Sequence, residues 1–147
     1  MTVIAWDGKT LAADRRSNTS WGVHDTVTKI SRHNGHLLAT AGKGAVALEM
    51  QAWWIAGAES DKFPASARSD DGGNLIVITP DRRVLQFATG PIPSEMQGQF
   101  YVVGAGGDIA LAAMHCGRSA FAAVVLACEL NSTCGNGIDT LTLEATP

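Results

Sequence analysis

Short β-prone runs joined by two-residue turns constrain the fold of this chain more than any other feature. Asp7-Gly8 follows the run Thr2 to Trp6, and Asn34-Gly35 separates Val27 to Arg32 from His36 to Ala41. Pairs of this type favour the tight turns of β-hairpins. The sequence therefore predicts two successive hairpins, and hairpins build antiparallel sheet.

The next segment changes period. Between Ala45 and Ala58 the apolar residues fall on two helical stripes. A helix that is apolar on two faces is buried on two faces. We expect it to lie under a sheet and also against a second surface, which is either a neighbouring helix or a neighbouring subunit.

The rest of the chain predicts further strands and two helices. In chain order these are a third hairpin, a strand, two helices and a final strand: Leu75 to Ile78 with Val84 to Ala88, Phe100 to Val103, Asp108 to Cys116, Ser119 to Leu130 and Ile138 to Leu143. Ser119 is expected to cap its helix. The stretches Ser17 to Asp25, Ser60 to Gly73 and Gly90 to Gly98 are interpreted as polar segments or loops. The fold class is α+β, with helices on the faces of antiparallel sheets.

Composition bounds the class of protein. The 147 residues are 46% hydrophobic with a formal net charge of -3, which predicts one folded domain covering residues 1–147 and excludes disorder. Eleven Lys and Arg residues form no concentrated basic face, so nucleic acid is not an expected partner. No membrane span or secretory leader is predicted. The three cysteines, an odd count without metal-ligand spacing, indicate reduced thiols in a cytoplasmic protein.

Two weaker motifs carry little function. Gly104-Ala105-Gly106-Gly107 stands between a strand and a helix, but the antiparallel context argues against a dinucleotide-binding turn, and a tight turn that lines a site is preferred. His33 and His36 flank the Asn34-Gly35 turn. We expect them to project apart on the surface rather than to bind zinc, which would need two further ligands.

The N-terminus carries the chemistry. Thr2 follows the initiator Met1, and threonine is small enough for routine methionine removal. An N-terminal threonine holds a hydroxyl nucleophile and an amine base in one residue. An α-amine ordinarily has a pKa of about 7.7–8.0, so it can accept the hydroxyl proton near neutral pH.

The residues after Thr2 occur in an informative order. Asp14 ends the strand that pairs with the Thr2 strand, Lys29 lies in the next strand, and Thr40-Ala41-Gly42 leads into the first helix. This order resembles the proteasome β-subunit family, in particular its HslV peptidase branch, along nearly the whole chain. The segments 103–113 and 134–139 are also similar to that family's turn-helix and terminal-strand motifs.

The resemblance implies a fold, an assembly and a set of roles. The fold is the four-layer αββα sandwich of N-terminal-nucleophile hydrolases, assembled into homo-oligomeric rings that act on peptides or unfolded proteins, with an ATP-dependent unfoldase as partner. Thr2 would be nucleophile and base, Lys29 the nearby cation and Asp14 its anchor. The Gly42 N–H would form the oxyanion hole and Thr40 would border the substrate pocket. No metal or other cofactor is implied.

Two observations keep other interpretations open. Taken singly, Lys29 and Asp14 are each compatible with solvated surface charges. The family's usual serine is Ala105 here, and its later acid and serine are Asn131 and Cys134. The prediction is thus a threonine-type peptidase, provided that Met1 is removed. Its alternatives are a catalytically weakened ring subunit, an amidohydrolase of small amides and a plain binding domain.

Overall fold

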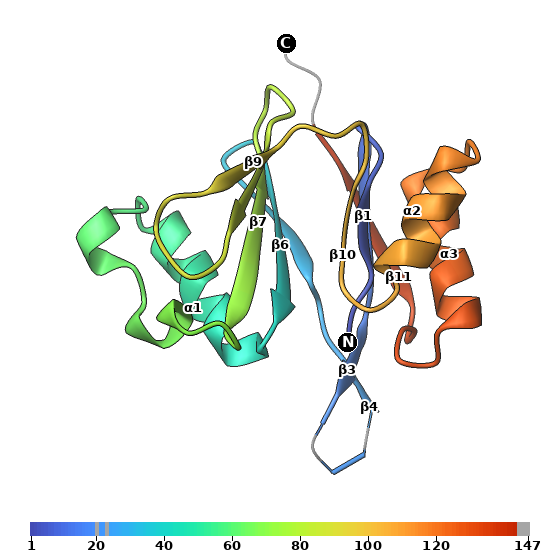
Figure 1. The fold of residues 1–147 in the computed structure, drawn as a ribbon, viewed down its shortest axis with the longest axis horizontal. Coiled ribbons are helices and arrows are strands. Elements are labelled where there is room, and N and C mark those ends of the chain that lie inside the picture. Colours follow the sequence, from blue (N-terminus) through green and yellow to red (C-terminus); the bar gives the residue numbers. More distant parts are fainter. Residues whose placement is uncertain (20, 23, 144–147) are drawn as a thin grey trace.

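The computed structural model describes residues 1–19, 21–22 and 24–143, and two antiparallel sheets face each other at its centre (Figure 1). One sheet has the order β10-β1-β2-β11, with β10 (Tyr101–Val103), β1 (Ile4–Trp6), β2 (Thr10–Asp14) and β11 (Ile138–Thr142). The other runs in chain order through β5 (Ile30–His33), β6 (His36–Gly42), β7 (Gly73–Ile78), β8 (Val84–Phe87) and β9 (Ser94–Met96). A separate ribbon pairs β3 (Arg16–Asn18) with β4 (His24–Thr26).

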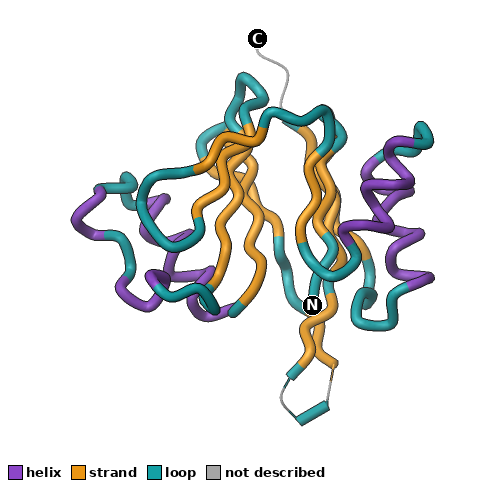
Figure 2. Tube along the Cα trace, viewed as in Figure 1, coloured by secondary structure: helices purple, strands orange, loops and turns teal. Residues whose placement is uncertain are grey.

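Helices cover the outer faces of both sheets (Figures 1 and 2). The helix α1 (Gly44–Ile55) packs on β6 and β7, whereas α2 (Gly107–His115) and α3 (Ala120–Leu130) pack on the sheet that contains β1 and β2. Two short 3-10 turns, Ser60–Lys62 and Ala65–Arg68, follow α1. This layering is the predicted αββα sandwich.

Three apolar clusters hold the layers together. The cluster between the sheets contains Ile4, Leu11, Leu37 and Ile76, all fully buried. The cluster under α2 and α3 consists largely of alanines, and the cluster under α1 contains larger side chains such as Trp53. Small residues let α2 and α3 approach their sheet closely, and this is the sheet that begins just after Thr2.

The predicted hairpins β1–β2 and β5–β6 are confirmed. Gly8 turns the first with φ +93°, and Asn34 and Gly35 turn the second with φ +47° and +75°. Glycine and asparagine tolerate these positive φ values with little cost. The Ser119 cap is also confirmed, because the Ser119 side chain accepts a hydrogen bond from the Ala122 N–H at 3.2 Å.

Three strand predictions need correction. The strand expected over Val27 to Arg32 begins only at Ile30, so Lys29 lies just before it. The stretch Ser17 to Asp25 contains most of the β3–β4 ribbon, and the loop Gly90 to Gly98 contains β9. The ribbon lacks apolar alternation because its β4 strand is exposed, so the usual sequence signal is missing.

Among residues 1–19, 21–22 and 24–143, none covers the second apolar face expected for α1. Val46, Met50 and Trp53 are buried, whereas Leu48 is 58% and Ile55 43% exposed. The sheet covers one stripe of the helix only.

The two turn histidines do not project apart as expected. His33 and His36 pair across the β5–β6 hairpin, and both rings contact Trp54, with centroid separations of 6.0 and 4.9 Å. Residues that face each other across a strand pair share one side of the sheet, so both can meet the same aromatic ring.

Among the described residues, no helix combines the length and the apolar character needed to cross a membrane.

Candidate active site

Thr2 lies two residues before the start of β1 and is 7% exposed. Its carbonyl oxygen accepts a hydrogen bond from the Gly106 N–H at 3.1 Å. Gly104 passes so close that a Cβ there would lie 2.1 Å from the Thr2 carbonyl oxygen. The glycine-rich segment is therefore a tight turn between β10 and α2, as predicted. Its glycines leave space for the backbone of Thr2.

Asp14 ends β2 and is fully buried. Its Oδ1 accepts from the Lys29 ammonium at 2.7 Å and from the Val3 N–H at 3.0 Å. Its Oδ2 accepts from the Gly135 N–H at 3.0 Å and from the Arg16 N–H at 3.3 Å. Four donors satisfy this carboxylate, as a buried charge requires. A surface ion pair with the neighbouring arginines is ruled out for Asp14.

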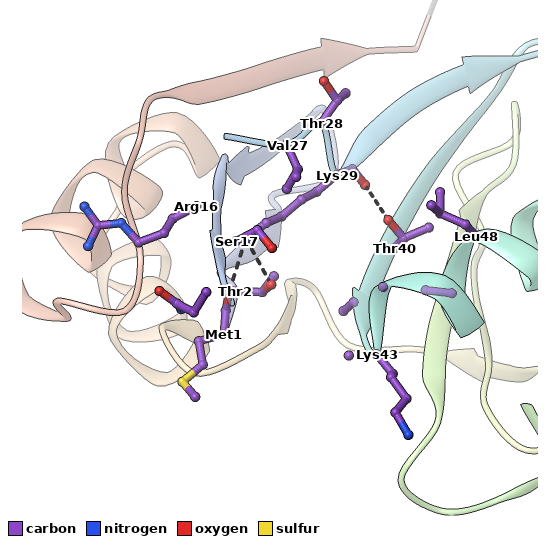
Figure 3. A pocket seen from close by; sticks show the side chains of 15 residues that line it. Met1, Thr2, Arg16, Ser17, Val27, Thr28, Lys29, Thr40, Lys43 and Leu48 are labelled. Atoms are coloured by element: carbon purple, nitrogen blue, oxygen red, sulfur yellow. Dashed lines mark hydrogen bonds between the residues drawn. The ribbon is translucent and has the colours of Figure 1, made fainter. Parts of the chain in front are cut away.

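Lys29 contacts both of these residues, and Figure 3 shows its contact with Thr2. Its Nζ lies 3.1 Å from the Thr2 hydroxyl oxygen, 2.7 Å from Asp14 Oδ1 and 3.3 Å from the Met1 carbonyl oxygen. The side chain is only 7% exposed, so it is no solvated surface lysine. The Thr40 N–H fixes the Lys29 backbone by donating to its carbonyl at 2.9 Å.

This cluster has a definite chemical capacity. A cation in hydrogen-bond contact favours the ionised form of a hydroxyl group, and Lys29 is held in that contact by Asp14. In the chain that carries Met1, the Thr2 nitrogen is a peptide nitrogen and cannot accept a proton. Removal of Met1 converts that nitrogen into an α-amine in the same residue as the hydroxyl.

A cavity of about 590 Å³ opens beside Thr2. Thr40 and Gly42 line it, as does Lys29 (Figure 3). Gly42 has φ +83°, and a Cβ there would lie 2.9 Å from the Gly72 carbonyl oxygen, so glycine is required at this bend. The structure thus places all five predicted site residues, Thr2, Asp14, Lys29, Thr40 and Gly42, in or directly behind one cavity.

Sequence reasoning missed part of the cavity wall. Val27, Ala47 and Leu48 also line it, as do Ser17 and Asn18 of the ribbon. The available signal for Leu48 was its place in the first turns of a helix that starts two residues after the predicted site residue Gly42. No comparable signal marked the polar ribbon.

The three departures from the resembled pattern lie near this site. The Asn131 amide donates to the Ala105 carbonyl at 3.2 Å, and its side-chain oxygen accepts from the Thr133 hydroxyl at 2.6 Å. Cys134 is buried, and burial raises the pKa of its thiol. Burial likewise raises the pKa of Cys128 to about 11. Both thiols are therefore neutral at physiological pH, and Asn131 contributes hydrogen bonds without charge.

Within the described part of the chain, no group of three or more His, Cys, Asp or Glu side chains is arranged to hold a metal ion.

Comparison with known proteins identifies the fold. No family model and no curated protein matches the sequence. Solved structures do match: BPH of Thiobacillus denitrificans in complex with epoxomicin has a TM-score of 0.72 at 19% identity, with 100% of both chains covered. Eukaryotic HslV from Trypanosoma brucei has a TM-score of 0.70 at 17% identity, with 98% of this chain and 99% of that chain covered.

A third neighbour is the Anbu (Gly-1) mutant from Hyphomicrobium sp. strain MC1, with a TM-score of 0.71 at 14% identity, covering 100% of this chain and 86% of that one. The fold is thus the N-terminal-nucleophile hydrolase sandwich. More particularly, it is the form found in HslV-like proteins, so the predicted resemblance is confirmed at the level of the fold. At these identities the comparison assigns no role to an individual residue.

Proposed function

We propose that this chain is a threonine-type peptidase whose nucleophile is Thr2 after removal of Met1. The observation that carries the proposal is the Lys29 ammonium, buried and held by Asp14 at 2.7 Å while it lies 3.1 Å from the Thr2 hydroxyl. Lysine side chains in folded proteins normally remain solvated, so a buried lysine in contact with a hydroxyl is unusual. This placement fits a role in activating a weak hydroxyl nucleophile.

The proposed reaction uses the amine and hydroxyl of Thr2 together. The amine accepts the hydroxyl proton while the oxygen attacks the substrate carbonyl carbon, and the Lys29 ammonium stabilises the developing negative charge. The Gly42 N–H is the proposed donor to the tetrahedral oxyanion. Collapse passes the proton to the leaving amine and leaves an ester on Thr2, which a water activated by the same amine then hydrolyses.

We further propose a ring of identical subunits that encloses these sites, in the cytoplasm, with an ATP-dependent unfoldase as a possible partner. The exposed stripe of α1 supports assembly, since Leu48 and Ile55 are apolar and uncovered in the single chain. The HslV-like form of the fold points the same way. Size-exclusion chromatography with light scattering tests the assembly, and a monomer at micromolar concentration contradicts it.

A labelling experiment tests the nucleophile. Two preparations are compared, one with Thr2 as its first residue, generated by a cleavable tag, and one that keeps Met1. A β-lactone should acylate Thr2 in the first preparation only, as read by intact mass and peptide mapping. Epoxomicin, the molecule bound in the Thiobacillus neighbour, serves as a second probe. Thr2→Ser should retain labelling and Thr2→Ala should lose it.

The labelled protein must also turn over a substrate. A panel of fluorogenic peptides and small amides separates the peptidase from an amidohydrolase of small amides. Labelling without turnover would favour a catalytically weakened ring subunit, an alternative that Ala105 supports because it places no hydroxyl beside Thr2. Absence of both labelling and turnover from the Thr2-first preparation refutes the proposal and favours a binding domain.

A further inference from the structure

One tryptophan of this chain is almost fully exposed. Trp21 lies at the tip of the β3–β4 ribbon and is 87% exposed, whereas Trp6 and Trp53 are 3% and 6% exposed. The ribbon projects from the body of the molecule (Figure 1). A tryptophan side chain is a large apolar surface, and such surfaces on exposed projections commonly serve binding.

The ribbon is braced at its base. The Arg16 Nε donates to the Asn136 side-chain oxygen at 3.1 Å, and the Asn18 amide donates to the Thr133 carbonyl at 3.3 Å. On the other strand, the Asn136 amide donates to the Asp25 carbonyl at 3.0 Å. These bonds tie both strands to the turn before β11. The same turn supplies the Gly135 N–H to Asp14, so the ribbon and the buried cluster share one support.

The ribbon is also a wall of the cavity. Ser17 and Asn18 of β3 and Val27, which follows β4, line it (Figure 3). Trp21 is three residues beyond Asn18, a path of at most about 10 Å in extended chain. A polypeptide that is held at Thr2 and extends along the ribbon past Asn18 therefore comes within reach of Trp21 after about three further residues.

We propose that Trp21 is a distal substrate-binding residue that favours polypeptides over short peptides by contacting an apolar side chain beyond the cavity. This inference rests on the proposed function. The occupant is the substrate rather than a second copy, because the ribbon that carries Trp21 is itself continuous with the cavity wall. The aromatic ring gives a large contact area with few side-chain torsions to fix, which suits varied sequences.

Two peptides test the inference. One is a short fluorogenic substrate that fills only the cavity, and the other adds four residues that include a phenylalanine on the side that runs along the ribbon. Trp21→Ala should lower kcat/KM for the long peptide about tenfold through KM and leave the short peptide unchanged. Trp21→Phe should rescue most of the effect. Ile92→Ala, at another side chain that is 85% exposed but outside the cavity, should change neither.

A binding measurement separates this inference from the proposed function. In Thr2→Ala protein, anisotropy of a labelled long peptide reports affinity without turnover, and adding Trp21→Ala should weaken it about tenfold. Failure of the wild-type chain to cleave either peptide, with affinity still dependent on Trp21, refutes the peptidase and keeps the binding role. Equal effects on both peptides, no effect on either, or a changed oligomer mass without a change in peptide affinity each overturn the inference.

Discussion

The two sides of the candidate site differ in how firmly they are held. On one side, Asp14 is fully buried and Thr2 and Lys29 are each 7% exposed, joined by short hydrogen bonds. On the other side, the cavity wall carries Leu48 at 58% exposure and Val27 at 36%. In the proposed peptidase, the buried side would hold the reacting groups in place, and the open wall would be free to contact a substrate or a neighbouring subunit.

Removing the Lys29 cation should have the largest effect on the buried side of the site. We expect Lys29→Met to lower turnover by about 10²–10⁴-fold, because Thr2 loses its only side-chain ion contact among the described groups. It should also lower the free energy of unfolding by about 3–5 kcal/mol, since Asp14 then remains buried without a cation. Peptide hydrolysis and urea unfolding measure the two effects.

A double variant separates charge from chemistry. Adding Asp14→Asn to Lys29→Met removes the unpaired carboxylate, so much of the lost stability should return while turnover does not. Recovery of activity in the double variant would show that the pair acts only through folding.

A backbone change should break the buried side through geometry alone. Gly104 has φ +98°, and the added Cβ of Gly104→Ala would lie 2.1 Å from the Thr2 carbonyl oxygen. We expect a loss of at least about 1–3 kcal/mol of unfolding free energy and loss of β-lactone labelling. The control is Gly90→Ala, where the new Cβ meets nothing within 4 Å. Equal thermal stability of both variants would contradict the close approach of Gly104 to Thr2.

A change in the open wall should leave stability intact. Leu48 lines the cavity but is largely exposed, so Leu48→Ala should shift the unfolding free energy by less than about 0.5 kcal/mol. KM for a peptide with an apolar side chain at the cleaved bond should rise roughly tenfold. Leu130→Ala, at an exposed residue outside the cavity, is the matched control. A large stability loss in Leu48→Ala would place this residue in the core.

Thiol labelling should give the smallest effect, and it measures whether solvent reaches the buried side of the site. With its pKa raised to about 11, Cys128 is about 0.1% thiolate at pH 8, and thiolate rises about tenfold per pH unit until pH approaches 11. Iodoacetamide at pH 8 should therefore modify exposed Cys116 well before Cys128 or buried Cys134. In denaturant all three should react alike. Comparable native rates for Cys116 and Cys134 would mean that solvent reaches the back of the cluster.

Local signals explain what the sequence could predict of the fold. Asp7-Gly8 and Asn34-Gly35 specify turns by their own backbone preferences, and Ser119 specifies a helix start, so these features needed no tertiary information. The ribbon and β9 were missed because the pairing partner, and not the local pattern, defines them. For α1, the described residues cover one apolar face, and the prediction that a neighbouring subunit covers the other remains a prediction, because apolar periodicity does not say whether a face is covered by the same molecule.

The site divides in a similar way. The order of Thr2, Asp14, Lys29 and Gly42 could be recognised only through its resemblance to the HslV branch, since Asp14 and Lys29 taken singly are compatible with surface charges. The backbone N–H groups that donate hydrogen bonds to these residues could not be predicted from the sequence. The Gly135 N–H that holds Asp14 comes from a turn 121 residues away, and glycine has no side chain that could indicate this contact in the sequence.

The cluster of Thr2, Asp14 and Lys29 takes residues from both sheets of the sandwich. It can therefore form only after both sheets have folded. Thr2 precedes β1 and Asp14 ends β2 in one sheet, whereas Lys29 directly precedes β5 of the other sheet. Neither half alone assembles the three groups. The proposed peptidase activity would therefore arise only when the two sheets pack together. An incompletely synthesised or partly unfolded chain would not hydrolyse other proteins.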